Sequence, residues 1–167
     1  MCDCCDYIAE RGGDPGDPVL TGQWERAEAA RIEAAVGGGR WRLTYVEPDA
    51  GTPSFAYTIG LWSHGHPELV VFGLDPAVSG PLLNVLGERI LAGLRLTDGD
   101  RLDIEGWPLS VFELPNAEQV VLWAARFYGG VVSAVQLVYP DRHGVWPWEP
   151  HCHLHPGAQP MPGQFRA

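Results

Sequence analysis

The cysteines and histidines near the two ends of the chain have the clearest capacity for chemistry. Cys2 and Cys5 are separated by two residues, a spacing that lets both thiolates bind one metal ion from a tight turn. Cys152 and His153, near the other end, can fill the remaining two positions of a tetrahedral zinc site. Because the termini of a domain often lie close together, the sequence predicts a structural zinc ion that joins the two chain ends.

The ligand set of this zinc site stays open. Cys4, His151 and His155 are as suitable by residue type as their neighbours in sequence. A single Cys-x-x-Cys pair is also consistent with thiols and solvated histidines on mobile chain ends. Cys152, which lies between two histidines, could instead act as an activated nucleophile.

His66 and Glu68 form a second candidate site. A carboxylate close to an imidazole can orient the ring or act as a general base, so this pair predicts a small metal-assisted hydrolase or peptide-modifying enzyme. Gly65 and Pro67 also indicate a turn between two strands. The alternative is therefore that both side chains hydrogen-bond to backbone groups of this turn.

Aromatic residues form a third candidate site, a groove for a small molecule or a peptide. Prolines 147 and 150 would hold nearby tryptophan rings in fixed directions, which suits such a groove. The alternative is that the last segment packs against the sheet, because aromatic rings bury large apolar areas. The predicted groove residues are Tyr57, Gln136, Tyr139, Trp146 and Trp148.

The spacing of apolar residues along the sequence predicts the helices and strands that position these residues. We expect helices over about 22–36, 80–94 and 116–127, and strands at 41–45, 55–61, 69–74, 101–105, 108–114 and 132–139. This order is not a regular βαβ alternation. It favours an α+β fold over residues 1–167, a single domain with a largely antiparallel curved sheet and about three helices. Residues 1–20 are predicted to be a Cys-rich loop, and residues 141–167 a Pro/His/Trp-rich arm.

The composition excludes several classes of protein. The chain has 167 residues and a net charge of −10, from 21 acidic and 11 basic side chains that form no basic run. Nucleic-acid binding and adhesion to an anionic membrane are therefore not expected. The first residues lack the basic start and apolar middle of a secretory signal, so we expect a cytoplasmic protein whose cysteines stay reduced.

Three segments together resemble a known family. They are residues 55–61 (Phe-Ala-Tyr-Thr-Ile-Gly-Leu), residues 66–71 (His-Pro-Glu-Leu-Val-Val), and residues 136–141 followed by the Trp-Pro-Trp of residues 146–148. This chain resembles a bacterial and phage family catalogued as domain of unknown function 4262. The resemblance covers nearly the whole chain and implies a small stand-alone cytoplasmic domain. It implies no catalytic residue.

Three functions remain open at this point. The first is a binding or accessory domain that holds a small molecule, peptide or protein, because motifs for nucleophile elbows, phosphate loops, dinucleotides and zinc proteases are missing from the sequence. The second is the enzyme that uses His66 and Glu68. The third is a phage or host protein-interaction module whose acidic surface engages a basic partner.

Overall fold

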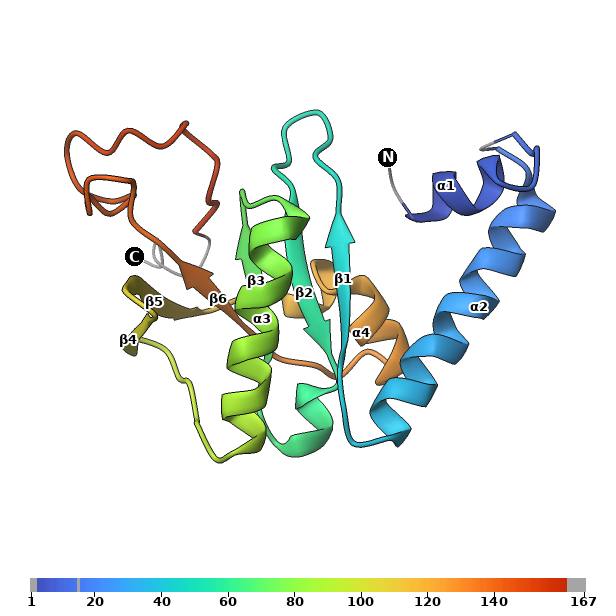
Figure 1. Cartoon of the computed structure of the whole chain (residues 1–167), viewed down its shortest axis with the longest axis horizontal. Helices are drawn as coiled ribbons and strands as arrows, with labels where there is room; N and C mark the ends of the chain where they lie inside the picture. Colours follow the sequence, from blue (N-terminus) through green and yellow to red (C-terminus); the bar gives the residue numbers. More distant parts are fainter. Residues whose placement is uncertain (1–2, 15, 162–167) are drawn as a thin grey trace.

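A computed structural model describes residues 3–14 and 16–161, which form a six-stranded sheet with helices on both faces (Figure 1). The strands pair antiparallel except for the parallel contact between β3 and β6. The predicted α+β class and largely antiparallel sheet are thus confirmed. In spatial order the strands are β1 (Arg42–Val46), β2 (Phe55–Ile59), β3 (Glu68–Phe72), β6 (Ala134–Val138), β5 (Trp107–Glu113) and β4 (Arg101–Ile104).

The N-terminal segment is helical where a loop was predicted. It contains α1 (Asp3–Ala9) and the start of α2 (Pro18–Gly37). Asp17 caps α2, because its carboxylate accepts hydrogen bonds from the backbone N–H groups of Val19 at 2.8 Å and Leu20 at 3.3 Å. The prediction of a loop over residues 1–20 is therefore wrong within the described residues, and α2 begins at Pro18, before the predicted start near residue 22.

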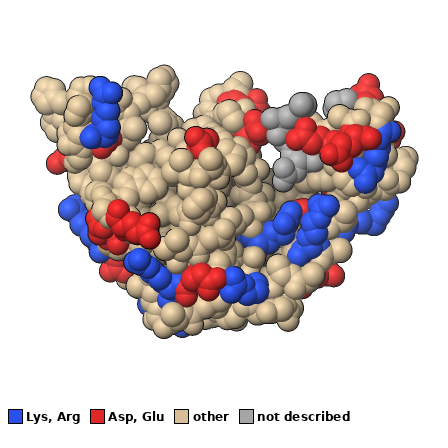
Figure 2. Space-filling model, viewed as in Figure 1, with Lys and Arg blue, Asp and Glu red and all other residues tan. Residues whose placement is uncertain are grey.

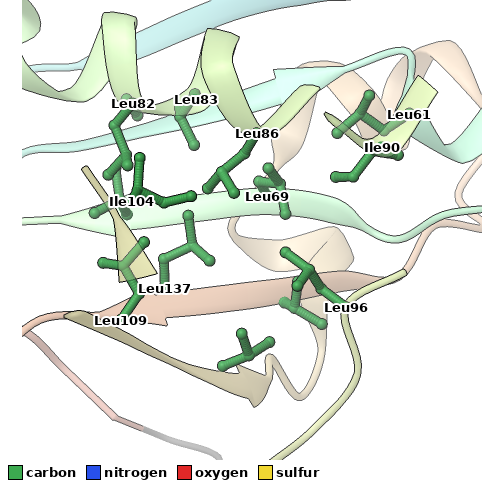
Figure 3. Packing of buried hydrophobic residues seen from close by; sticks show 14 of the residues in the cluster. Leu61, Leu69, Leu82, Leu83, Leu86, Ile90, Leu96, Ile104, Leu109 and Leu137 are labelled. Atoms are coloured by element: carbon green, nitrogen blue, oxygen red, sulfur yellow. The ribbon is translucent and has the colours of Figure 1, made fainter. Parts of the chain in front are cut away.

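One face of the sheet is covered by α3 (Pro76–Leu91). Figure 3 shows Leu82, Leu83, Leu86 and Ile90 of this helix pointing toward apolar side chains of the sheet, which include Leu69, Leu109 and Leu137. The helix lies close to the ring of Trp41, because a Cβ atom at Gly87 would lie only 2.5 Å from a ring carbon. Glycine is therefore required at the point where helix and ring meet.

The opposite face carries a second core, formed mainly by α4 (Leu122–Phe127), the short η2 (Ala117–Gln119) and Ile32 of α2. Every residue of β2, β3 and β6 is buried, as expected for strands covered on both faces. The predicted helix over 116–127 is interrupted. Asn116 adopts a left-handed φ of 53°, and Val121 leaves the helical region with a ψ of 62°.

The C-terminal arm, in its described part up to residue 161, is held by hydrogen bonds to Gln136 of β6 and to Tyr139, the residue after this strand. The side-chain amide of Gln159 accepts from the backbone N–H of Tyr139 at 3.1 Å and donates to its carbonyl at 2.8 Å. Through these two bonds the Gln159 side chain pairs with the backbone of Tyr139 as a neighbouring strand would. The arm approaches the end of β3 so closely that a Cβ atom at Gly73 would lie 2.6 Å from the carbonyl oxygen of Ala158. No helix in the described segments is long and apolar enough to cross a membrane.

Candidate ligand-binding site

The predicted zinc site is not formed by the residues that the structure describes. Cys5 lies in α1, and Cys152 and His153 lie in the C-terminal arm, and these segments are at opposite ends of the long axis of the molecule (Figure 1). Over residues 3–14 and 16–161, no group of three or more His, Cys, Asp or Glu residues could hold a metal ion. Cys2, the fourth predicted ligand, lies outside the described residues.

His66 is completely buried, and both of its ring nitrogens have hydrogen-bond partners. Nδ1 lies 2.7 Å from the carbonyl of Pro67, and Nε2 accepts from the backbone N–H of Leu96 at 3.0 Å. Burial lowers the pKa of His66, which favours the neutral ring that these contacts require. The ring therefore joins the segment after α3 to the turn before β3.

Glu68 is also completely buried, at the start of β3. Its carboxylate accepts hydrogen bonds from the hydroxyl of Thr58 at 2.6 Å and from the backbone N–H groups of Gly60, Leu61 and Trp62 at 2.8, 3.3 and 3.1 Å. These N–H groups open the short helix η1 (Leu61–His64). Both candidate catalytic side chains are thus engaged in turn contacts, and this geometry gives their catalytic roles no support.

Most of the residues that were predicted to form an aromatic groove instead pack the C-terminal arm against the sheet. Trp146 and Trp148 stack on one another with ring centroids 5.0 Å apart, and Trp148 contacts Phe112 of β5 edge to face. Tyr139 donates its hydroxyl to the carbonyl of Phe72, and Gln136 donates to Pro160. These contacts match the alternative interpretation for four of the five residues. The fifth, Tyr57, lies elsewhere, on the face covered by α4.

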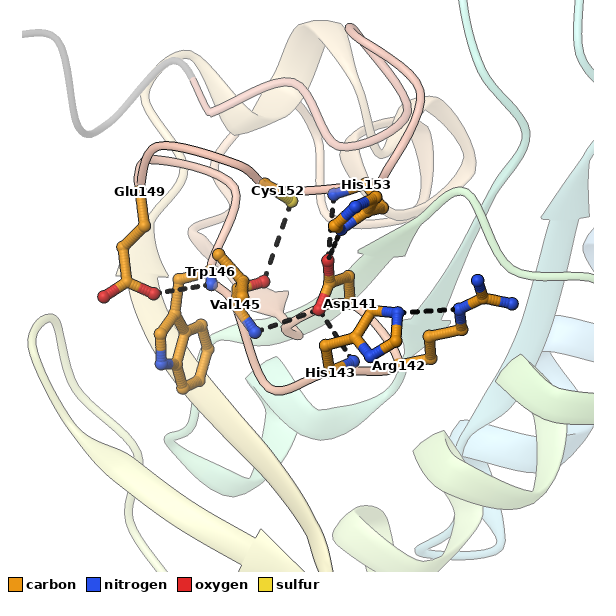
Figure 4. A network of polar contacts seen from close by, with 8 residues as sticks. All are labelled: Asp141, Arg142, His143, Val145, Trp146, Glu149, Cys152 and His153. Carbon is orange, nitrogen blue, oxygen red and sulfur yellow. Dashed lines mark hydrogen bonds and ion pairs between the residues drawn. The ribbon is translucent and has the colours of Figure 1, made fainter.

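Asp141 organises the arm (Figure 4). One carboxylate oxygen accepts from the backbone N–H groups of His143 and Val145, and the other accepts from the backbone N–H of His153 at 2.8 Å. Hydrogen bonds, first of all that from His153, hold the pKa of Asp141 far below its usual value of 3.8. Because the folded-state pKa is lowered, the contribution of Asp141 to arm stability is present above pH 3.8 and is lost as the pH falls further.

Asp141→Asn is expected to loosen the arm, because an amide group presents an NH2 where two donors need an acceptor. Amide hydrogen exchange across residues 142–158 should become roughly 10-fold faster at neutral pH. Asp17→Asn is the matched control, since the Asp17 carboxylate accepts similar backbone hydrogen bonds at the start of α2, at the far end of the molecule from the arm (Figure 1). Unchanged exchange in the Asp141 variant would show that another contact holds the arm.

A cavity of about 420 Å³ opens between the N-terminal helices and the sheet. Helices α1 and α2 form one wall, β1 forms the second, and β2 with the start of α4 forms the third. We call it the α2–β1 cavity. Its central lining residues are Trp24 and Glu28 of α2, Thr44 and Val46 of β1, Tyr57 of β2, and Leu122 and Trp123 of α4.

Two tryptophans from different helices border the cavity. The rings of Trp24 and Trp123 meet edge to face with centroids 5.6 Å apart, and the guanidinium of Arg126 lies over the ring of Trp123. Both indoles are only half-buried. The cavity therefore offers aromatic surface to a ligand, next to Phe55 and Val46.

Two hydroxyl groups lie side by side in this apolar lining. Thr44 and Tyr57 face each other across the β1–β2 ladder. The Tyr57 hydroxyl accepts from the backbone N–H of Trp123 at 3.2 Å, and burial raises its pKa to about 12, so it stays protonated. The buried Thr44 Oγ1 makes no hydrogen bond of regular geometry to the described residues, although Thr44 interacts with the Tyr57 hydroxyl and acts to lower its pKa. A buried polar atom without a regular hydrogen bond is costly, and a ligand that bonds to it gains specificity.

The charged groups of the lining are all acidic. Glu28 is compensated by Arg42, at 2.9 Å from Nη2, and by Arg31, at 3.2 Å. Burial acts to raise the pKa of Glu28, but the hydrogen bonds and charges of the two arginines outweigh it and lower the pKa. Glu47 and Asp49 are exposed at the opening. Figure 2 shows acidic side chains (red) over α1 and beside the β1–β2 turn, on the two sides of this region.

Comparison with known families identifies the family of this chain. A model of DUF4262, described as a domain of unknown function, matches residues 36–153. The chain belongs to this family. No curated protein and no solved structure matches it. The DUF4262 segment supplies the β1, β2 and α4 walls of the cavity, whereas Trp24 and Glu28 precede the matched residues. The α2–β1 cavity is thus built where the first helices of this chain dock on the family's sheet.

Proposed function

We propose that this DUF4262 protein is a binding module whose ligand site is the α2–β1 cavity. The observation that carries this proposal is an apolar cavity of about 420 Å³ with two tryptophans and two neighbouring hydroxyl groups, those of Thr44 and Tyr57. Its volume lies within the range of about 300–1,000 Å³ that is usual for sites of small ligands. Few but well-placed polar groups among aromatic walls are typical of such sites.

The residues that line the cavity indicate which class of ligand we expect. A flat apolar group fits against Trp24 and Trp123, and a polar atom on this group reaches Thr44 and Tyr57. Glu47 and Asp49 favour a positive charge at the opening, and no Lys, Arg or His lines the cavity among the described residues. We therefore expect aromatic or branched apolar ligands that carry an ammonium or guanidinium group.

Tryptamine is the first probe, and indole-3-acetate is its matched control with the opposite charge. We expect tryptamine to bind with a dissociation constant of about 1 mM or lower, and indole-3-acetate to bind roughly 10-fold more weakly. Isothermal titration calorimetry measures both. Added salt should reduce the difference, because exposed charges are screened over about 8 Å at 0.15 M.

Substitutions of two exposed apolar residues, one inside and one outside the lining, test where the ligand binds. Leu122 is 63% exposed and lines the cavity, whereas Val131 is 69% exposed and lies outside the lining. Leu122→Ser should weaken tryptamine binding several-fold, by about 1 kcal/mol of lost apolar contact, and Val131→Ser should leave it unchanged. Equal effects of both variants, or equal binding of the two indoles, would contradict the proposed site.

A further inference from the structure

We propose that the occupant of the α2–β1 cavity is an extended basic peptide that adds to β1 as a new edge strand. An apolar side chain of this peptide enters the cavity, and a lysine or arginine next to it approaches Glu47 and Asp49. This inference rests on the proposed binding function and names the class of its ligand.

The first support is the position of β1 in the sheet. β1 pairs with β2 over five residues and has no strand on its other side among the described residues. An edge strand carries a row of backbone N–H and C=O groups that can pair with another chain. Three consecutive residues of this strand, Thr44, Tyr45 and Val46, line the cavity. The edge and the cavity are therefore parts of one site.

The strand at the opposite edge of the sheet, β4, differs from β1 in its protection against pairing. β4 is four residues long and exposes two charged side chains, Arg101 and Asp103. Charged side chains and short length are the usual protection of an edge against pairing. β1 has one charged residue, Arg42 at its start, whose guanidinium pairs with Glu28 of α2, and its residues from Leu43 to Val46 are uncharged and half-buried. By this criterion β4 is protected against an added strand, and β1 is not over residues 43–46.

The geometry of a strand explains how one peptide uses both features. Side chains of an added strand alternate between the two faces of the sheet, so every second one lies on the face of Thr44 and Tyr57. There it meets Trp24 and Trp123. Main-chain hydrogen bonds supply affinity in this mode of recognition, and pockets for alternate side chains supply specificity.

The acidic side chains near β1 favour a basic peptide. Glu47 immediately follows β1, and Asp49 lies in the turn after it, both exposed. The whole chain has a net charge of −10, which speeds the encounter with a cationic partner and repels an acidic one. A basic residue within a few positions of the inserted side chain would lie beside both carboxylates.

Capped pentapeptides of the pattern Lys-Val-Xaa-Val-Lys, with Trp, Leu or Val at the centre, are the probes. We expect the Trp peptide to bind at least about 10-fold more tightly than tryptamine, because the added strand contributes backbone hydrogen bonds. Replacing both lysines with glutamates should weaken binding about 10-fold or more. Glu47→Lys in the protein should reverse this preference, whereas Glu113→Lys, an exposed site on β5, should not.

N-methylation of the peptide separates strand addition from simple insertion of a side chain. Only one of the two alternating sets of amides can pair with β1, so methylating that set should reduce affinity at least about 10-fold, and methylating the other set should not. Equal binding of both methylated peptides, or tryptamine binding without peptide binding, would overturn this inference and leave the proposed function standing. Failure of every probe, tryptamine included, would overturn both.

Discussion

Glu68→Ala is expected to lower the free energy of unfolding by about 4 kcal/mol or more, the largest effect that we expect of a single substitution. The change leaves the Thr58 hydroxyl and three backbone N–H groups without an acceptor in a completely buried place. Each buried donor without a partner costs about 1–3 kcal/mol. Urea unfolding followed by circular dichroism measures the loss, with Glu113→Ala as an exposed control that should change stability by less than about 0.5 kcal/mol.

The pH dependence gives an independent check on Glu68. Burial raises the pKa of Glu68 above 4.5, although the hydrogen bonds from Thr58 and the η1 backbone act against it. A carboxyl group with a raised folded-state pKa binds protons more readily in the folded protein, so stability falls as the pH rises from 4.5 through the folded-state pKa. Glu68→Gln should remove this part of the pH profile. A loss below about 1 kcal/mol in the alanine variant would contradict the structural role of Glu68.

Glu28→Ala is expected to destabilise the protein by about 3 kcal/mol and to abolish binding at the cavity. The Glu28 side chain is 5% exposed and bonds to Arg42 of β1. Removing one member of a buried pair leaves the other charge uncompensated, at a cost of about 3–5 kcal/mol. Because Arg42 is 29% exposed, we expect the lower end of this range. Glu28 and Ile32 are the only buried residues of α2, so this pair is a main anchor of the helix.

A surface ion pair provides the control for Glu28. Glu88 pairs with Arg40, and both side chains are 56% exposed, so Glu88→Ala should cost less than about 1 kcal/mol. Since the pKa of Glu28 is lowered, its contribution should be present above pH 4.5 and should fade as the pH falls below this value. Denaturant melts at pH 3.5 and 7 measure this. Equal losses in the two alanine variants, or undiminished tryptamine binding in Glu28→Ala, would contradict the role of this pair.

The fold could largely be predicted because its strands alternate or run continuously apolar. Leu43 and Tyr45, or Val70 and Val71, carry these patterns without help from distant residues. Helix α1 and the first turn of α2 were missed for a local reason. Cys, Asp, Gly and Pro in residues 1–20 indicate a loop, yet Asp17 and Pro18 also form a helix start, four residues before the predicted one.

The binding site could be predicted only in part, because its walls come from elements far apart in the sequence. Tyr57 was found as an aromatic residue in a recognisable strand. Trp24 and Trp123 become neighbours only after α2 and α4 dock on the same face, and no periodic pattern reports this contact. Conversely, His66 and Glu68 were selected by residue type, and only the structure shows that both are buried and hydrogen-bonded to backbone groups.

The central claim is that an aromatic cation occupies the α2–β1 cavity, and intermolecular nuclear Overhauser effects with tryptamine test it most directly. The account predicts contacts from the indole protons of tryptamine to the Thr44 methyl group and to the side chains of Trp24 and Trp123. Contacts confined to other residues, such as those of the C-terminal arm, would contradict it.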